Sequence, residues 1–247
     1  LSDLDQSYTG SGIGATAGTT PAGLAVHMTY DGSTTLPVDP GTYSVVAMIV
    51  DGNYAGSASG TLTIGDMEGP VPDNPVLPLL TDECSVTPVP PTATDLYAGQ
   101  ISGTTGTPFP ITTQGTTVIT WTYDDGQGNI STQTQNVVID DQNAPATPVL
   151  ADQTVDCSET LPAPTTTDNC AGTVTGSTTD PLVYSIQGNY VVNWTFDDGN
   201  GNVVSASQNV IVMDLSAPEA PVLEDIIGEC SATAVPPTTT DACAGTI

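Results

Sequence analysis

The fold of this chain is decided by QGTTVITWTYDDGQGNISTQTQNVVIDD (Gln114–Asp141) and by QGNYVVNWTFDDGNGNVVSASQNVIVMD (Gln187–Asp214). The two stretches align without a gap, and their tryptophans are 194 − 121 = 73 residues apart. The same offset relates the cysteines at 84, 157 and 230, and those at 170 and 243. Self-similarity at a fixed period is the signature of a repeat protein. A third copy therefore begins near Leu215 and reaches about its midpoint at Ile247.

Each copy has the pattern of a β-sandwich with short strands. In the second copy, apolar residues alternate at Tyr190, Val192, Trp194 and Phe196, which predicts a half-buried strand. Val203–Met213 forms the other arm of a hairpin, and shorter strands are expected at 149–150, 153–157, 172–178 and 182–186. Large aromatic residues favour burial, so Trp121 and Trp194 are predicted to lie in the core. Units of this size with these signals are typical of immunoglobulin-like sandwiches.

The first part of the chain follows a different register. Its predicted strands are 26–30, 41–50 and 57–64, separated by Asp-Gly turns. We therefore expect a separate β domain at 1–66, complete repeats at 67–140 and 141–213, and a partial repeat at 214–247. The predicted fold class is all-β, with tandem immunoglobulin-like β-sandwich domains arranged as an elongated rod.

The composition excludes several functions. The chain has 28 acidic residues, no lysine or arginine, and a formal charge of −28. Nucleic-acid binding, attachment to anionic membranes and phosphoryl transfer all depend on basic side chains, so none of them is expected. A hydrophobic content of 38% argues against disorder, and no apolar run is long enough for membrane insertion.

The cysteines suggest an oxidising compartment. Cys157 and Cys170 are 13 residues apart, as are Cys230 and Cys243, which predicts two disulfides, each within one repeat. In the first copy Tyr97 occupies the second cysteine position, so Cys84 is expected to lack a partner. Cys84 is then either a buried thiol or the site of an intermolecular bridge.

The acids recur at matching places of the copies, namely the end of each unit, the loop after the first cysteine, and the hairpin turn. Aspartate combined with asparagine and glycine in loops is typical of calcium ligands. The candidate metal ligands are Glu68, Asp95, Asp124, Asp125, Asp140, Asp141, Asn143, Asp168, Asn169, Asp197, Asp198, Asp214 and Asp241. Alternatively, these residues serve only as turn and cap residues, for which their backbone preferences suffice.

The topology of an immunoglobulin-like sandwich brings these three places together at its N-terminal end. Asp140 and Asp141 of the linker are then expected near Asp168 and the Asp197–Asp198 turn. Clustered carboxylates repel one another, and the chain has no basic side chain to neutralise them. The sequence therefore predicts bound Ca²⁺ at the interdomain junctions.

Two resemblances fit this organisation. TTPAGLAVHMTYDGSTTLPVDPGTYSVVAMIVDGNYAGSASGTLTI (residues 19–64) resembles the MBG-type repeat of large bacterial surface proteins. The 73-residue units, with ECS, TDNC, QGNYVVNWTFDDGNGN and VIVMD, resemble the HYR-like immunoglobulin-fold repeats of long Bacteroidetes adhesins, including gliding-motility-associated surface proteins. The linker DDQNAP (140–145) is similar to the DxNDNAP calcium linker of cadherins. The resemblance implies an extracellular stalk or filament on a bacterial cell surface, without catalytic activity.

Other functions and partners remain open at this stage. Paired acids such as Asp197 and Asp198 could serve a hydrolase, but their repetition in the previous copy and the lack of accompanying basic groups argue against an enzyme. A carbohydrate- or protein-binding adhesive module is the alternative function. The expected partners are other copies in a filament, or a continuation of the chain that completes the third repeat, and surface glycans or other cells bound through a domain outside this sequence.

Overall fold

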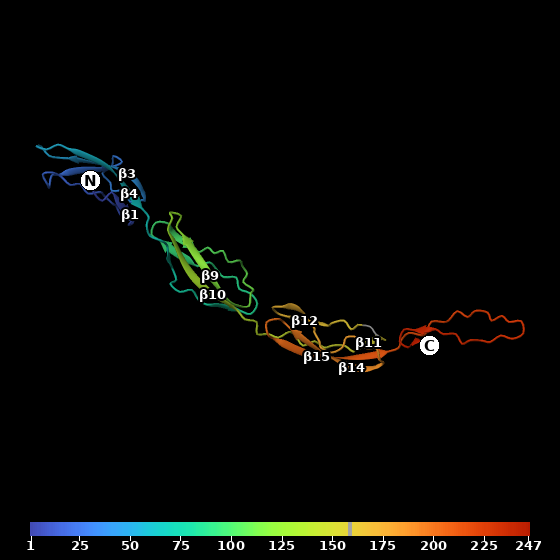
Figure 1. The fold of residues 1–247 in the computed structure, drawn as a ribbon. Helices are drawn as coiled ribbons and strands as arrows, with labels where there is room; N and C mark the ends of the chain where they lie inside the picture. The colour runs from blue at the N-terminus through green and yellow to red at the C-terminus, as the bar shows by residue number, and fades with distance from the viewer. Residues whose placement is uncertain (158–159) are drawn as a thin grey trace. The chain divides into compact units, whose positions relative to one another are not determined.

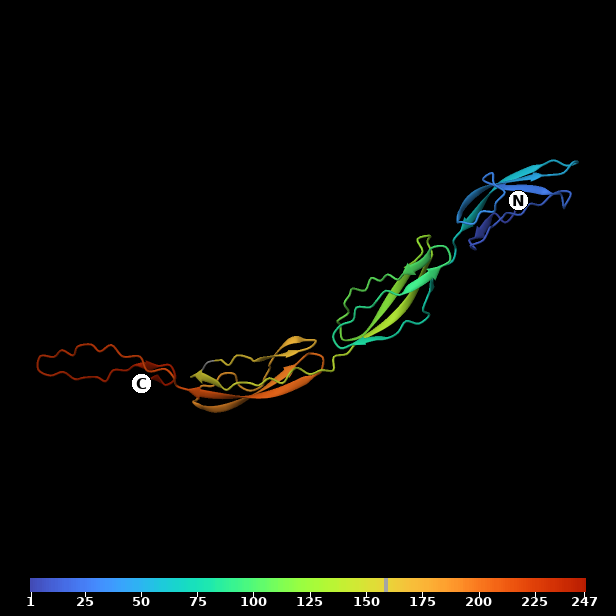
Figure 2. The ribbon, with the colours of Figure 1, turned by 180° about the vertical axis from the view of Figure 1, so that it is seen from behind.

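The structure is a computed structural model that describes residues 1–157 and 160–247, and the elements found there are all strands (Figures 1 and 2). The predicted all-β class is thus confirmed. The chain forms two compact units, Leu1–Ile139 and Asp140–Ile247, which are described separately.

The first unit begins with a four-stranded sheet in the order β1-β4-β3-β2. The three predicted strands are confirmed to within one residue, and β1 is an additional strand that runs parallel to β4. Alternate residues of β3 and β4, including Val45, Leu62 and Ile64, are buried against Ile13 and Tyr30. The strands are β1 (Asp5–Ser7), β2 (Val26–Tyr30), β3 (Gly41–Ile49) and β4 (Ser57–Gly65).

The first complete repeat forms a two-layer sandwich in the same unit. One sheet has the order β6-β10-β9 and the other β5-β7-β8. Ile119, Trp121 and Tyr123 of β9 are buried together with Ala93 of β7, so the core lies between the two sheets. The strands are β5 (Val71–Pro72), β6 (Leu80–Asp82), β7 (Thr92–Asp95), β8 (Gly99–Ser102), β9 (Gly115–Asp124) and β10 (Ile130–Ile139).

The second unit repeats this arrangement. Its sheets have the orders β11-β15-β14 and β12-β13. Val192, Trp194 and Phe196 of β14 pack with Val174 of β13, as the alternating pattern predicts. The strands are β11 (Gln153–Asp156), β12 (Thr165–Asp168), β13 (Gly172–Thr175), β14 (Gly188–Asp197) and β15 (Val203–Met213).

Two of the short predicted strands of the second repeat are wrong. Residues 149–150 and 182–186 do not belong to a strand, and the second range has only the isolated bridge between Thr160 and Val183. Pro148 and Pro181 lie directly before these ranges, and proline cannot donate a ladder hydrogen bond. The strand β12 was not expected, because its threonine run has no apolar alternation.

Each complete repeat contains one buried tryptophan with the same polar partner. Trp121 Nε1 donates to Gln135 Oε1 at 3.1 Å, and Trp194 Nε1 donates to Gln208 Oε1 at 3.0 Å. Each glutamine amide in turn donates to a backbone carbonyl of the early part of its repeat. The indole N–H groups are therefore satisfied in the core, as burial requires.

The third repeat forms only the short hairpin of β16 (Thr240–Asp241) and β17 (Gly245–Thr246) in the described residues. Residues 219–238 form no strand and are exposed, including Val222, Leu223, Ile227 and Val235. In the second repeat the corresponding segment contains β11, which pairs with β15.

A glycine beneath the core aromatic residue allows the two sheets to approach closely. A Cβ atom at Gly176 would lie 2.9 Å from Phe196 Cε1 and 3.3 Å from the Pro164 carbonyl oxygen. We expect Gly176→Ala to lower the free energy of unfolding by about 1–3 kcal/mol, because overpacking forces the core apart. Chemical denaturation measures this loss. Gly106→Ala is the control, since no atom lies within 4 Å of its Cβ position, and an equal loss in both variants would contradict the packing explanation.

Candidate metal centres and the disulfide

One aspartate per repeat organises the turn after the first cysteine. Asp95 Oδ1 accepts hydrogen bonds from the backbone N–H groups of Tyr97 (2.8 Å) and Ala98 (2.7 Å). Asp168 binds the N–H groups of the residues two and three positions later in the same way, and so does Asp241. In each turn one carboxylate oxygen holds the backbone, and the second oxygen is left for another interaction.

A second aspartate lies in each β-hairpin turn. Asp125 Oδ1 accepts the N–H groups of Gln127 and Asn129, and its Oδ2 accepts the Asn129 amide at 2.7 Å. Asp198 repeats this pattern with Asn202. The same asparagines also donate to the linker, Asn129 to the carbonyl of Asp66 and Asn202 to that of Asp141. The hairpin turn and the linker are thereby tied together.

The linker aspartates complete three groups of potential ligands. Oxygens of Asp66, Asp95 and Asp125 all lie within 4.8 Å of one another. Asp141 and Asp168 group similarly with Cys170, and Asp156 and Asp214 group with Cys157 and Cys243. Asp95, Asp125 and Asp141 are each at most 8% exposed.

Three carboxylate oxygens in these regions are buried without a hydrogen-bond partner among the described residues. They are the Oδ2 atoms of Asp66, Asp168 and Asp241. Asp241 as a whole is only 8% exposed. A buried, unpaired carboxylate oxygen is costly unless it is protonated or meets a cation. Asp168 and Asp241 occupy the same turn position in successive repeats, whereas Asp66 belongs to the linker before the first repeat.

The environment of the first group is electrostatically unfavourable for one of its members. Burial raises the pKa of Asp66, and although the Glu68 N–H opposes this, the charges of Asp95 and Asp125 raise it further. Burial also acts to raise the pKa of Asp125, but the hydrogen bonds from Asn129 and from backbone N–H groups outweigh burial, and the net shift is downward. Asp125 is therefore held ionised beside Asp66, whose negative charge is disfavoured.

The predicted ligands separate into two sets. The structure brings together Asp95 and Asp125, Asp141 and Asp168, and it places Asp214 beside Asp156. Asp198 approaches Asp141 through the shared Asn202 amide, and Asp241 lies two residues before Cys243. The remaining predicted ligands are exposed and lie outside the three groups, namely Glu68, Asp124, Asp140, Asn143, Asn169 and Asp197. Of these, Asp124 and Asp197 accept N–H groups of the hairpin turns.

Sequence reasoning missed Asp66 and Asp156. The linkers align as DMEGP, DQNAP and DLSAP, beginning at Asp66, Asp141 and Asp214, which shows that the first linker is shifted by two residues from the 73-residue register. This pattern of an aspartate four residues before a proline identifies Asp66, whereas the fixed offset selects Glu68. For Asp156 the signal is the acid that stands directly before the first cysteine of each copy, at Glu83, Asp156 and Glu229.

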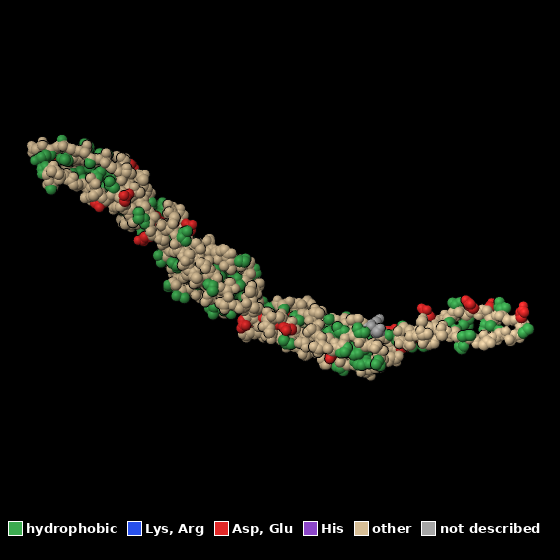
Figure 3. Space-filling view, in the orientation of Figure 1, with side chains coloured by type: hydrophobic (Ala, Val, Ile, Leu, Met, Phe, Trp, Pro, Cys, Tyr) green, Lys and Arg blue, Asp and Glu red, His purple; other side chains and the backbone are tan. Residues whose placement is uncertain are grey.

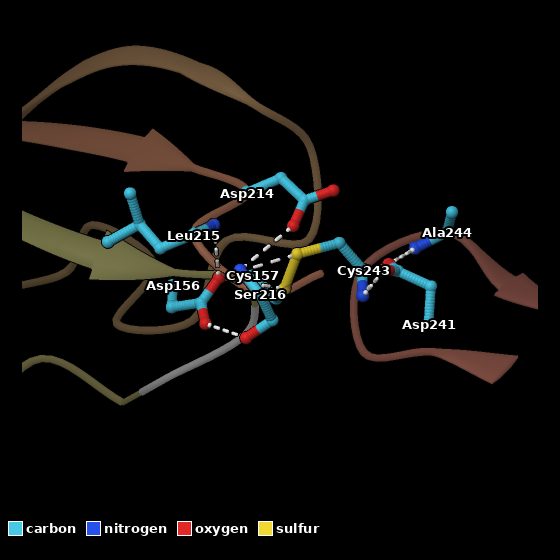
Figure 4. Close-up of a disulfide and its surroundings, with 8 residues drawn as sticks. All are labelled: Asp156, Cys157, Asp214, Leu215, Ser216, Asp241, Cys243 and Ala244. Atoms are coloured by element: carbon cyan, nitrogen blue, oxygen red, sulfur yellow. Dashed lines mark hydrogen bonds between the residues drawn. A yellow bond between two sulfur atoms is a disulfide. The ribbon is translucent and has the colours of Figure 1, made fainter. Parts of the chain in front are cut away.

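The disulfide pairing differs from the prediction. Cys157 is bonded to Cys243, across 86 residues, and Cys230 is a free, exposed thiol (Figure 4). The predicted pairs Cys157–Cys170 and Cys230–Cys243 are therefore wrong. Cys84, which was expected to lack a partner, is disulfide-bonded, as is Cys170. The 13-residue spacing misled the prediction because 86 equals 73 plus 13, so a bond to the next repeat fits the spacing equally well.

The position of Cys243 has another role in the first repeat. There the corresponding residue is Tyr97, and its ring packs edge-on against Tyr8 of the first sheet domain, with ring centroids 5.2 Å apart. The turn aspartate thus presents Tyr97 to the preceding domain in one repeat and Cys243 to the preceding repeat in another. The second cysteine position is a contact point with the domain before it.

The pairing can be tested with a single protease site. Because the chain has no lysine or arginine, Val222→Arg creates one tryptic cleavage site, at a side chain that is 93% exposed. We expect the cleaved protein to keep its full mass until a reductant releases the last 247 − 222 = 25 residues. Bonding between Cys230 and Cys243 would instead release this piece without reductant. Mass spectrometry distinguishes the outcomes, and Cys243→Ser in the same background serves as the control.

The visible surface shows acidic side chains in red and no basic ones, in accordance with the sequence (Figure 3). None of the described segments forms a helix with the length and hydrophobicity of a membrane span.

Comparison with known proteins gives one family match. The model of the MBG domain matches residues 1–68. No curated protein is similar enough to this chain to count as a match.

Several solved structures are similar at low sequence identity. The protocadherin gammaB7 EC3-6 structure is 12% identical, covering 77% of this chain and 68% of its own, with a TM-score of 0.27. The protocadherin GammaB4 extracellular domain is 13% identical, covering 87% of this chain and 49% of its own, with a TM-score of 0.29. Mouse cadherin-23 EC22-24 is 13% identical, covering 79% of this chain and 84% of its own, with a TM-score of 0.27. The chain thus spans about half of the GammaB4 structure.

Proposed function

We propose that this chain is a structural segment of an extracellular stalk or filament of a bacterial surface protein, in which Ca²⁺ bound at the aspartate groups stiffens each linker. The observation that carries the proposal is the recurrence of a buried carboxylate oxygen without a partner at Asp66, Asp168 and Asp241. A chain without lysine or arginine has no side chain that could neutralise these groups, apart from one histidine.

The donor set favours Ca²⁺ over other metals. The groups offer carboxylate oxygens, which are the ligands of hard cations. Cys170, Cys157 and Cys243 are disulfide-bonded and supply no thiolate, so the arrangement does not suit zinc. In the first group Asp66, Asp95 and Asp125 would hold the ion, and in the second Asp141 and Asp168 would do so.

Calcium would stiffen the chain because its ligands come from different segments. Asp66 and Asp141 belong to linkers, whereas Asp95 and Asp168 belong to the turns of the following sandwich. A shared ion fixes each linker to the repeat that it enters. The disulfide between successive repeats supports the extracellular setting, since such bonds persist in oxidising compartments.

A structural role is favoured over catalysis. Among the described residues the aspartates of the three groups are engaged in turn and linker hydrogen bonds that repeat from copy to copy. The single histidine, His27, is exposed on β2, in the first sheet domain. Repetition of an arrangement suits architecture, whereas a catalytic site needs one specific constellation.

Calorimetry and scattering test the proposal. We expect Ca²⁺ to raise the melting temperature relative to the same protein in chelator, because a ligand that binds only the folded state stabilises it. Small-angle scattering should show a larger maximum dimension with Ca²⁺ than without. An unchanged melting temperature would overturn the calcium assignment, and a maximum dimension typical of a compact globule would overturn the stalk.

A further inference from the structure

The Cys157–Cys243 disulfide closes a loop that contains almost the whole core of the second repeat. The bond spans 86 residues. Of the eight buried residues of this core, only Val155 precedes Cys157. The others lie inside the loop and are Leu161, Val174, Val192, Trp194, Phe196, Val210 and Val212. Both strands of the hairpin, β14 and β15, also lie within it.

The position of the bond determines how a pulling force would cross the repeat. Tension from the N-terminal side enters through β11, which ends at Asp156, directly before Cys157. It then crosses the bond to Cys243 and continues toward the C-terminal end. The hydrogen bonds between β14 and β15 are not on this path.

The surroundings of the bond reinforce this connection (Figure 4). Asp156 Oδ1 accepts the N–H of Leu215 at 3.0 Å, and its Oδ2 accepts the hydroxyl of Ser216 at 2.6 Å. These hydrogen bonds lower the pKa of Asp156, Ser216 contributing most, so the carboxylate that makes them stays ionised. The chain that leaves β15 is thus anchored beside Cys157, at the same point where the disulfide begins.

We propose that the Cys157–Cys243 disulfide is a tension bypass, which carries force from the second repeat to the third while the part of the core inside the disulfide loop stays unloaded. Without the bond, the same force would pass through β15 and shear it against β11, its parallel partner. This inference deepens the proposed stalk function and rests on it, because only a chain under tension needs such a bypass.

Single-molecule pulling tests the bypass on the full chain. Cys84→Ser and Cys170→Ser are introduced first, so that one disulfide remains. Full extension of this protein is compared with that of the variant that also carries Cys157→Ser and Cys243→Ser. At about 3.5 Å per residue, the 86 residues of the loop should add roughly 300 Å to the extended length of the variant. Equal extended lengths would overturn the proposal.

A second measurement tests the bypass without the variant that lacks Cys157 and Cys243, in case that variant fails to fold. The protein with the single disulfide is held at constant force, and reductant is then added. Each molecule should lengthen in one step of up to roughly 300 Å as the bond breaks and the loop is loaded. The absence of such steps contradicts the bypass. Calcium binding and scattering do not depend on this bond. Failure of the bypass therefore shows only in the pulling experiments, whereas failure of the stalk function shows in the melting temperature and the scattering.

Discussion

Replacing both Cys157 and Cys243 by serine is expected to lower the free energy of unfolding of the second repeat by about 4–5 kcal/mol. The bond closes an 86-residue loop, and the chain-entropy model gives roughly this value for a loop of that length. The loss should be about a third or more of the stability of a small domain, because such domains are stable by only about 5–15 kcal/mol. Chemical denaturation followed by circular dichroism measures it.

Cys230→Ser is the matched control for this double variant. Cys230 carries a free, exposed thiol in the third repeat, so its replacement should leave the stability of the second repeat unchanged. With Cys84→Ser and Cys170→Ser as the background, in which one disulfide remains, denaturation in reductant should reproduce the loss caused by replacing Cys157 and Cys243. A loss below about 1 kcal/mol in the double variant would show that the bond does not constrain the unfolded chain as expected.

Asp168→Asn is expected to remove most of the stabilisation that calcium gives the second repeat. The asparagine oxygen can still accept the N–H groups of Cys170 and Ala171, so the turn is retained. The charge beside Asp141 is removed, which relieves repulsion when no cation is present. In chelator the variant should therefore be at least as stable as the unmodified protein.

The difference appears when calcium is added. At a calcium concentration one hundred times the Kd, the unmodified protein gains about 2.7 kcal/mol from a single site, and the variant should lose most of this gain. Calorimetry in Ca²⁺ and in chelator measures both states. Asp197→Asn is the control, because Asp197 is exposed, accepts the turn N–H of Gly199 and lies outside the three ligand groups, so the calcium response should persist. A full calcium response in Asp168→Asn would contradict the proposed site.

The regular parts of the fold could be predicted from the sequence because the pattern of side-chain burial alternates there. The arms β14 and β15 agree with the alternating apolar residues, as do Trp121 and Trp194 in the core. The strand β12 could not be predicted, since Thr165, Thr166 and Thr167 lack alternation and pair with β13 only in the folded sandwich. The apolar pair Val149 and Leu150 led to a false strand, because Pro148 directly before it cannot donate a ladder hydrogen bond.

The candidate site was predictable in part. The turn aspartates recur at the fixed offset, and so they could be found by comparing the copies. Asp66 could not be found in this way because the first linker differs in length, and the pattern that preserves it is the spacing to Pro70. The disulfide pairing could not be predicted from the sequence for a different reason. Any periodic chain allows a bond within a copy or to the next copy at the same spacing, and only the fold brings Cys157 to Cys243.

The buried Trp–Gln pairs have a practical consequence for spectroscopy. The chain has two tryptophans, one in each complete repeat, with nearly identical hydrogen bonds. Their emission should overlap in the folded protein, while the first sheet domain and the third repeat contribute no indole signal. Replacing one tryptophan by phenylalanine would leave a fluorophore that reports on a single sandwich, so that each repeat can be followed optically without an external label.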